Sequence, residues 1–306
     1  MLRYVGERLL QAMIAIFGVL TIVFIVMHLS GDPTLLLVPQ GASAEMIADL
    51  RRELGFDRPL WVQYVGYLND LIHLDFGESV VQRVPAIDIV ASRLPYTIQL
   101  AAGALTVAIG VGIPAGILMA TRRGGWLDRV LTAVVVTGQS VPTFLSAILL
   151  IFVFAVTLGW LPASGIGGLS NLVMPSIALG ALSMSTFARM TRISVADELS
   201  KDYVRAARAR GLPMPKIIVR HVLRNASIPV ISIAALEIGN LLAGAVIIET
   251  VFAWPGIGQL AIQSIQARDF LIVQVIVLLI SFVYVITAVL ADFIYAIVDP
   301  RIRLAR

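Results

Sequence analysis

Long apolar segments with at most one charged side chain alternate along this chain with segments that carry nearly all of its charges. A bilayer core about 30 Å thick needs about 20 apolar residues in a helix. Six segments approach or exceed that length, and we expect each to form a membrane-spanning helix. They cover residues 9–29, 94–120, 130–158, 172–188, 225–248 and 270–291. The pattern therefore predicts an all-α integral membrane protein, with residues 1–306 forming one transmembrane domain.

The third and fourth predicted spans belong to one uncharged stretch, residues 130–188, which is too long for a single crossing. Gly, Pro and Ser are concentrated in residues 159–171, which we expect to form the turn between the two spans. Pro142 interrupts the third span, because proline lacks an N–H donor and kinks a helix. Such kinks are common in membrane helices, so the pattern leaves open whether this one is ordinary or part of a gate.

The long segment between the first two spans is expected to be helical rather than disordered. Ser43 can cap a short helix that ends at Gly55, and Pro59 can open a second helix. Pro85 can open a third, which we expect to end before Pro95. Apolar residues recur at helical spacing in this segment, so its helices need a surface on which to bury one face. That surface can be the outer ends of the spans, an external partner, or both.

Short cytoplasmic loops of membrane proteins are enriched in Lys and Arg, so the basic residues predict the orientation. Of 23 basic residues, 17 lie in residues 1–8, 121–129, 189–224 and 292–306, which are predicted to be cytoplasmic. Residues 30–93 hold five Arg against nine acids and are predicted to be external. Both termini are therefore expected inside. The first span exceeds the usual signal-peptide core and no small-x-small cleavage site follows at once, so we expect an uncleaved anchor.

The composition supports a membrane protein and gives no support to several kinds of enzyme. Apolar residues make up 58% of the chain and charged residues 14%, against about 45–50% and about 25% in soluble domains. With no Cys, disulfides and thiolate zinc sites are excluded. The three His residues do not form an HExxH motif, and no GxxxxGK[ST] phosphate loop occurs. We therefore expect no catalytic, cofactor or metal site in this chain.

Polar residues within spans are costly, and this makes them candidates for function. Glu237 lies in the fifth span, where it can line a polar pathway or make a structural contact with a second subunit. Gln139 and Ser140, beside the interruption of the third span, are further candidates for the translocation path. Glu249 is expected to cap or anchor the external end of the fifth span. A proton-coupled carrier would be expected to keep several such groups as a relay.

Residues 189–224 are too polar to enter lipid and too rich in helix-favouring residues to be a plain loop. We expect a helix there with acids at its start, bases at its end and Gly211 at its terminus, an order that suits the helix dipole. The acids are Asp197, Glu198 and Asp202. A loop that only sets orientation would need charge alone. Ala206 and Ala207 are small, and small residues allow another protein to approach closely.

This segment resembles the EAA loop of binding-protein-dependent ABC importer permeases, whose pattern Ala206, Ala207 and Gly211 match. The leading Glu of the pattern is Arg205 here and the hydrophobic-Pro element arrives late, at Ile228-Pro229. Both departures are typical of the peptide-importer branch. Other motifs of that branch are Gly31-Asp32-Pro33, Leu54-Gly55-Phe56-Asp57, Asp75-Phe76-Gly77, Arg93-Leu94-Pro95-x-Thr97, Leu158-Gly159-Trp160-Leu161-Pro162, His221-x-Leu223-Arg224-Asn225-Ala226, Glu249-x-Val251-Phe252-x-x-Pro255-Gly256-x-Gly258, Arg268-Asp269 and Asp299-Pro300-Arg301-Ile302-Arg303. Over almost its whole length, the chain is similar to the first permease subunit of dipeptide, oligopeptide and nickel ABC importers.

The resemblance implies a type I ABC importer fold with an external loop after the first span and a cytoplasmic coupling helix. It implies a bacterial cytoplasmic membrane, a second related permease, two ATPase subunits and an external solute-binding protein, but no nucleic acid. ATP and Mg²⁺ would bind to the ATPases, which would drive alternating access in the permeases. The residues implied to dock the ATPase are Asp202, Tyr203, Arg205, Ala206, Ala207 and Gly211.

The cargo implied by the resemblance is a small peptide first, and then a nickel chelate or a glutathione-like or opine-like compound. A secondary transporter or channel that works without ATP is the alternative class. It would require transport by this chain alone. A membrane enzyme would need a cluster of polar residues at one depth, and the sequence offers none.

Overall fold

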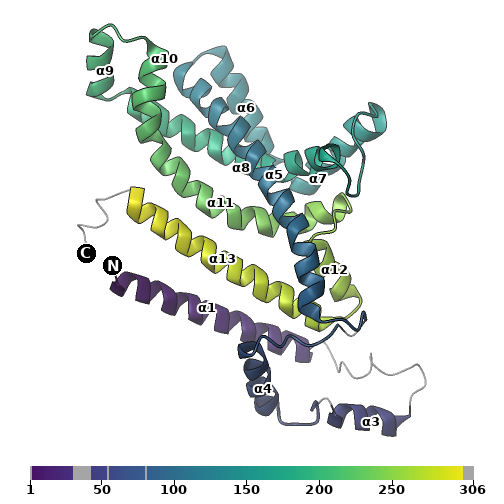
Figure 1. Ribbon diagram of the computed structural model, residues 1–306. Helices are drawn as coiled ribbons and strands as arrows, with labels where there is room; N and C mark the ends of the chain where they lie inside the picture. Colours follow the sequence, from purple (N-terminus) through teal and green to yellow (C-terminus); the bar gives the residue numbers. More distant parts are fainter. Residues whose placement is uncertain (1, 30–42, 54, 80, 299–306) are drawn as a thin grey trace. The chain divides into compact units, whose positions relative to one another are not determined.

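The computed structural model describes residues 2–29, 43–53, 55–79 and 81–298 (Figure 1). These residues form helices joined by turns, with one isolated bridge between Glu78 and Pro85. The elements are α1 Leu2–Leu29, α3 Ala44–Glu53, α4 Leu60–Ile72, α5 Ala86–Thr121, α6 Trp126–Ser140, α7 Thr143–Leu150, the π-helix η1 Ile151–Thr157, α8 Leu169–Leu199, α9 Asp202–Ala209, α10 Met214–Ile217, the π-helix η2 Ile218–Val222, α11 Leu223–Val251, α12 Ile257–Gln266 and α13 Phe270–Val298. The motifs that begin at Gly31 and Asp299, and position Leu54, lie outside the described residues.

Four helices in the described part of the chain are long and apolar enough to cross a membrane. They are Ala86–Thr121, Leu169–Leu199, Met214–Val251 and Phe270–Val289. Helix α1 carries a shorter apolar stretch, Met13–Val26. The third predicted span is not one helix, because Trp126–Ser140 and Thr143–Thr157 meet at an angle of 108°. Val141 and Pro142 have extended backbone there, and the missing N–H of proline prevents the helix from continuing.

The contacts divide the chain into two compact units. The first contains Met1–Leu94 and Leu260–Val283, and the second contains Pro95–Gln259 and Tyr284–Arg306. The chain passes from one unit to the other within α5, α12 and α13 rather than through a linker. No Gly- or Pro-rich segment could therefore have marked the boundary in the sequence.

Contacts between side chains hold α1 and α4 together in the first unit. The hydroxyls of Thr21 and Tyr64 are 2.6 Å apart, and the ring of Tyr64 lies 5.0 Å from that of Phe24. In the same unit, the hydroxyl of Ser79 donates to the buried carboxylate of Asp269, just before α13. The segment between α1 and α5 is thus fastened both to α1 and to the start of α13.

The structure confirms two of the three predicted external helices. The backbone N–H of Met46 donates to Ser43 Oγ at 3.2 Å at the start of α3, and Gly55 follows its end with φ +73°. Helix α4 begins directly after Pro59. The third prediction is wrong, because α5 does not end before Pro95 but continues to Thr121. Buried side chains on both sides of Pro95 keep this helix packed, which compensates for the backbone hydrogen bond that proline cannot make.

Helices α5 and α8 approach each other closely in the second unit because glycines line their contact. A Cβ atom on Gly112 would lie 2.6 Å from the carbonyl oxygen of Met184, and one on Gly116 would lie 2.5 Å from that of Ala188. Small residues at helix interfaces allow this backbone contact in membranes. Helix α8 also packs against α11 and α6, so it is the central helix on which the rest of the unit is built.

Candidate functional site

The short helix α9 lies between α8 and α10 and ends in a glycine cap. Gly211 has φ +80°, a backbone conformation that residues with a side chain rarely adopt. The N–H of Gly211 donates to the carbonyl of Arg208 at 2.9 Å, and that of Leu212 to the carbonyl of Ala207 at 3.2 Å. This pair of bonds is a Schellman motif, which satisfies carbonyls at the end of the helix. The predicted helix terminus at Gly211 is confirmed.

The start of α9 differs from the expectation that Asp197 and Glu198 belong to the same helix. These two acids lie at the end of α8, and the chain turns at Ser200 before α9 begins at Asp202. The hydroxyl of Ser200 donates to the carbonyl of Asp197 at 2.7 Å, and Lys201 then has extended backbone. A side chain that competes for a backbone carbonyl in this way favours a break in the helix.

Helix α9 rests on an apolar seat formed by other elements of its unit. Val204 is fully buried and Ala207 is half-buried, and both pack in a cluster with Val195 of α8, Ile217 of α10 and Val222 of η2. Burial of a valine side chain stabilises a fold by about 1.5–3 kcal/mol. The position of α9 is therefore coupled to the position of α8 and to that of α10 and η2, which lead directly into α11.

Glu198 connects the three elements around this seat. Its carboxylate accepts hydrogen bonds from Lys201 Nζ, from the hydroxyl of Tyr203 at 2.6 Å and from Asn225 Nδ2 at 3.4 Å. Burial and the neighbouring carboxylate of Glu198 raise the pKa of Tyr203 to about 12. The phenol therefore stays protonated at neutral pH and keeps donating its proton to Glu198. A single carboxylate thus ties the end of α8, the start of α9 and the start of α11 together.

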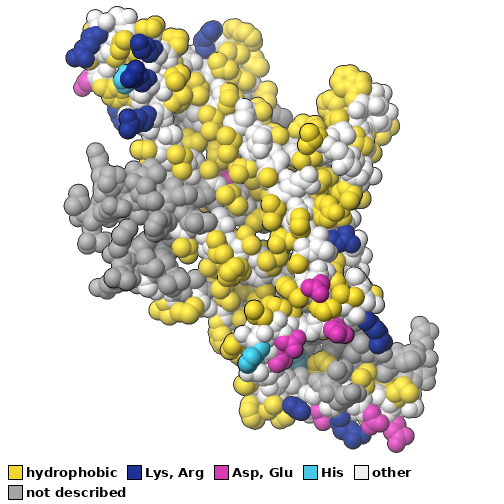
Figure 2. Space-filling view, in the orientation of Figure 1, with side chains coloured by type: hydrophobic (Ala, Val, Ile, Leu, Met, Phe, Trp, Pro, Cys, Tyr) yellow, Lys and Arg dark blue, Asp and Glu magenta, His cyan; other side chains and the backbone are white. Residues whose placement is uncertain are grey.

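The outward face of α9 is polar and basic. Arg205 pairs with Asp202, and both side chains are exposed, as is that of Ala206. Figure 2 shows Lys and Arg side chains gathered over α9 and α10. We call this the basic surface, and its exposed members are Arg205, Arg208, Arg210, Lys216, Arg220 and Arg224. An exposed ion pair contributes little to stability, so these side chains are available to an acidic partner.

The six predicted docking residues divide into two groups in the structure. Asp202, Arg205, Ala206 and Gly211 are exposed. The other two, Tyr203 and Ala207, face the interior of their unit, where they contact Glu198 and the apolar cluster under α9 and hold this helix in place. The Ala-Ala pair is therefore split, with one methyl group facing outward and the other packed inside.

Glu237, one of the predicted path residues, is buried and accepts a hydrogen bond from the hydroxyl of Ser183. This bond joins α11 to α8 within one chain. Gln139 is half-buried at the end of α6, and the exposed Ser140 donates to the carbonyl of Val136 in its own helix at 2.9 Å. The sequence could not reveal the Ser183 contact, because one serine among many in an apolar span carries no distinguishing signal.

Glu249 is fully buried at the end of α11 and accepts three hydrogen bonds. The donors are the hydroxyl of Thr97 at 2.6 Å and the backbone N–H groups of Gly258 at 2.7 Å and Gln259 at 3.0 Å. Thr97 in turn accepts the N–H of Ile257 at 2.9 Å. The carboxylate therefore caps the start of α12, a helix that the sequence pattern does not predict. The motifs containing Thr97 and Glu249 meet at this junction.

The first glycine of the Glu249 motif, Gly256, has a steric role at the same junction. A Cβ atom on Gly256 would lie 2.1 Å from Glu249 Oε1, so any side chain there would displace the carboxylate. Trp254 closes the junction by donating its indole N–H to the carbonyl of Tyr96 at 2.8 Å. The spacing of the motif thus follows from one buried carboxylate and the backbone that wraps around it.

Comparison with known proteins agrees with this geometry. Residues 112–304 match the model of the family described as "Binding-protein-dependent transport system inner membrane component", and residues 1–101 match its N-terminal component. The glutathione transport system permease protein GsiC of Escherichia coli strain K12 is 40% identical over 304 residues, 99% of each chain. The protein of the same name from Shigella dysenteriae serotype 1 has the same identity and coverage.

Two solved structures share the fold at low sequence identity. An inward-facing structure of the MetNI methionine ABC transporter superposes with a TM-score of 0.60 at 19% identity, covering 70% of this chain and 98% of the other. A structure of an amino acid ABC transporter with histidines has a TM-score of 0.52 at 18% identity, covering 69% and 94%. The helical arrangement is therefore that of type I importer permeases.

Proposed function

This chain belongs to the family of binding-protein-dependent transport system inner membrane components, and we propose that α9 is its docking element for an ATPase subunit. As an ABC importer permease it is not an enzyme, and ATP is hydrolysed on separate subunits. The observation that carries the proposal is the way in which α9 packs against the rest of its unit. Its exposed face is free for a partner, while Val204 and Glu198 connect its other face to α8 and α11.

In this mechanism, movement of the ATPases displaces α9, and the displacement reaches α8 and α11 through packed side chains rather than through a flexible loop. The Schellman cap at Gly211 and the Glu198 contacts keep α9 rigid at its two ends. Two discrete arrangements of packed helices then correspond to outward-open and inward-open states. ATP and Mg²⁺ bind to the ATPases, and this chain needs no cofactor of its own.

The proposed solute is a short peptide or a peptide-like compound such as glutathione. Support comes from the relatives, which are named for glutathione transport and match this chain over its full length. Glu237 of α11 is buried and accepts a hydrogen bond from Ser183, so we assign it to the contact between α11 and α8 rather than to a charge clamp for a solute. Selectivity would then reside in the solute-binding protein, and the permease would accept what that protein delivers.

The proposed assembly contains a second related permease, two ATPases and a solute-binding protein outside the cytoplasmic membrane of a bacterium. The basic surface would lie in the cytoplasm and α3 and α4 outside, with both termini inside. Support comes from the excess of Lys and Arg in residues 189–224 and the excess of acids in residues 30–93.

Single-cysteine labelling tests this proposal directly, because the chain has no native Cys. In the assembled importer, Ala206→Cys should crosslink to the ATP-binding subunit, and an impermeant thiol reagent should reach it only after the membrane is opened. The control Gly66→Cys, on an exposed position of α4, should react from outside and give no such crosslink. Labelling of Ala206→Cys from outside would overturn the orientation. Absence of the crosslink in a complex that transports normally would overturn the docking role.

A further inference from the structure

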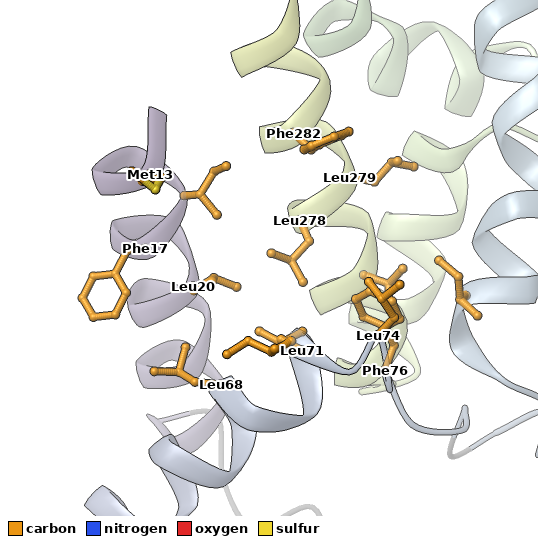
Figure 3. A pocket seen from close by; sticks show the side chains of 14 residues that line it. Met13, Phe17, Leu20, Leu68, Leu71, Leu74, Phe76, Leu278, Leu279 and Phe282 are labelled. Carbon is orange, nitrogen blue, oxygen red and sulfur yellow. The ribbon is translucent and has the colours of Figure 1, made fainter. Parts of the chain in front are cut away.

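A cavity of about 710 Å³ lies between α1 and α13, and all fourteen side chains that line it are apolar (Figure 3). Met13, Phe17 and Leu20 come from one face of α1, and Leu278 and Phe282 come from α13. Figure 3 shows Leu20 of α1 and Leu278 of α13 on opposite sides of the space, with the ring of Phe17 at the outer edge of α1. Phe17 and Phe282 are 54% and 56% exposed although both line the cavity. The two helices therefore leave a large apolar space unfilled between them.

The two helices place this space within the hydrocarbon of the membrane. Its α1 residues lie in or close to the apolar stretch Met13–Val26, and its α13 residues lie in the span Phe270–Val289. An apolar cavity stays free of water, and an empty one forfeits dispersion contacts with its walls. The medium around these helices is made of acyl chains. We propose that the cavity binds an acyl chain of a membrane phospholipid.

The size and shape of the cavity favour a flexible chain over a partner helix. Pockets for small ligands measure about 300–1,000 Å³, and about 710 Å³ is within that range. A helix with its side chains is about 10–12 Å across, so even two turns occupy roughly 850 Å³. Leu68 and Leu71 of α4 also cross one end of the space (Figure 3). A helix that spans the whole bilayer could not pass them, whereas an acyl chain can enter from the side.

Helix α4 has the character of a helix that lies at the membrane surface. It is too short to span a bilayer, and it exposes Trp61 at 71% and Val65 at 59%. Exposed Trp residues and apolar helix faces are typical of the membrane–water interface. Because α4 closes one end of the cavity, the headgroup of a lipid bound there would lie beside α4.

Tyr67 of α4 supplies a polar group for such a lipid. Its hydroxyl is buried and has no hydrogen-bond partner within the part of the chain that the structure describes. Burial, with a contribution from Tyr64, raises the pKa of Tyr67 to about 12, so the phenol is a donor at neutral pH. It is one helical turn from Leu71, which lines the cavity. Tyr67 itself does not line the cavity and its ring packs 5.7 Å from that of Phe24, so a bound lipid would have to turn the ring toward the cavity before its ester carbonyl accepted this hydrogen bond.

Photocrosslinking in the assembled importer tests the proposal. The complex is reconstituted in nanodiscs that contain phosphatidylethanolamine with a diazirine in its acyl chain. We expect much stronger labelling of α1 around Leu20 and of α13 around Leu278 than of Phe152, an exposed apolar residue of η1 that reports ordinary lipid contact. Equal labelling at the three places would overturn the proposal. A photoreactive residue at Leu278 that crosslinks to the second permease instead of to lipid would also overturn it.

Two variants separate a specific site from general lipid contact. Leu278→Trp fills the cavity and should reduce labelling near Leu20 without changing it at Phe152. Tyr67→Phe keeps the ring and removes the hydroxyl, so it should weaken retention of the lipid about fivefold, which corresponds to about 1 kcal/mol. Unchanged labelling near Leu20 in a folded Leu278→Trp complex would contradict the site. Unchanged retention in Tyr67→Phe would contradict the assigned hydrogen bond.

Discussion

Individual residues act in this protein mainly by joining segments that are far apart in the sequence. Thr97 and Glu249 are 152 positions apart, yet their side chains bond at 2.6 Å in a fully buried position. All three groups that contact this carboxylate are donors, so it must be an acceptor at both oxygens. Removing the Thr97 hydroxyl would leave the buried Oε1 of Glu249 without its donor, which costs more than the bond itself contributes.

For single residues, we expect Thr97→Val to destabilise the protein by about 1–3 kcal/mol, because it leaves Oε1 of Glu249 and the N–H of Ile257 without their hydrogen-bond partner. Thermal unfolding of the purified protein in detergent measures this change. Thr106→Val is the matched control on the same helix, since Thr106 is exposed and bonds only the carbonyl of Ala102. The control should differ from the unmodified protein by less than about 0.5 kcal/mol. Equal effects of the two substitutions would contradict the importance of the junction.

At the scale of elements, the contact between α5 and α8 depends on the absence of side chains. Gly112 and Gly116 lie on one face of α5, four residues apart, and both meet backbone carbonyls of α8. Backbone cannot move aside as a flexible side chain can, so the helices would have to separate to admit a methyl group. Because α8 also packs against α11 and carries Glu198, a shift there would reach the seat of α9.

We therefore expect Gly116→Ala to destabilise the fold by about 1–3 kcal/mol, as overpacking does in other cores. Gly110→Ala serves as the control, because a methyl group at Gly110 meets nothing within 4 Å. Unfolding temperature and the yield of assembled complex can be compared for the two variants. If Gly116→Ala proved as stable as Gly110→Ala, α5 and α8 could not be packed as closely as the structure shows.

At the scale of the whole molecule, the features described here suit a subunit that transmits work done elsewhere. Many apolar side chains are exposed on its helices, as expected for surfaces that face lipid or other subunits. The basic surface and α9 offer one site for a partner, and no cluster of His, Cys, Asp or Glu suited to a metal occurs in the described residues. Because the chain is an ABC importer permease and ATP is hydrolysed on separate subunits, transport should depend on the assembly rather than on this chain alone.

We expect this chain, reconstituted alone in liposomes, to show neither solute uptake nor ATP hydrolysis. Addition of its second permease, its ATPases and its binding protein should produce uptake that requires ATP. Measured uptake of labelled glutathione or dipeptides would also test the proposed solute class. Uptake by the isolated chain would instead support the alternative of an ATP-independent transporter.

Much of the architecture could be predicted because it depends on local physical properties. An uncharged stretch of sufficient length predicts a span, and Ser43, Pro59 and Gly55 mark helix ends through bonds and backbone angles within one turn. The same local signal failed at Pro95, where packing along α5 outweighs the loss of one hydrogen bond. It also failed to predict α12, whose start is held by a side chain from another helix.

Local properties of the chain suffice to predict the apolar spans and the helix end at Gly211, since these follow from hydropathy and from the positive φ that glycine tolerates. The packing of distant segments is needed to establish that Ala206 faces outward while Ala207 faces inward, and that Glu249 bonds Thr97. Helical periodicity sets the positions of side chains around the helix axis. The rotation of the helix about that axis, and so which side chain faces inward, depends on what packs against the helix. The inward face of a helix is defined only once distant segments pack against it, and the residue pattern of one segment does not identify the segments that will do so.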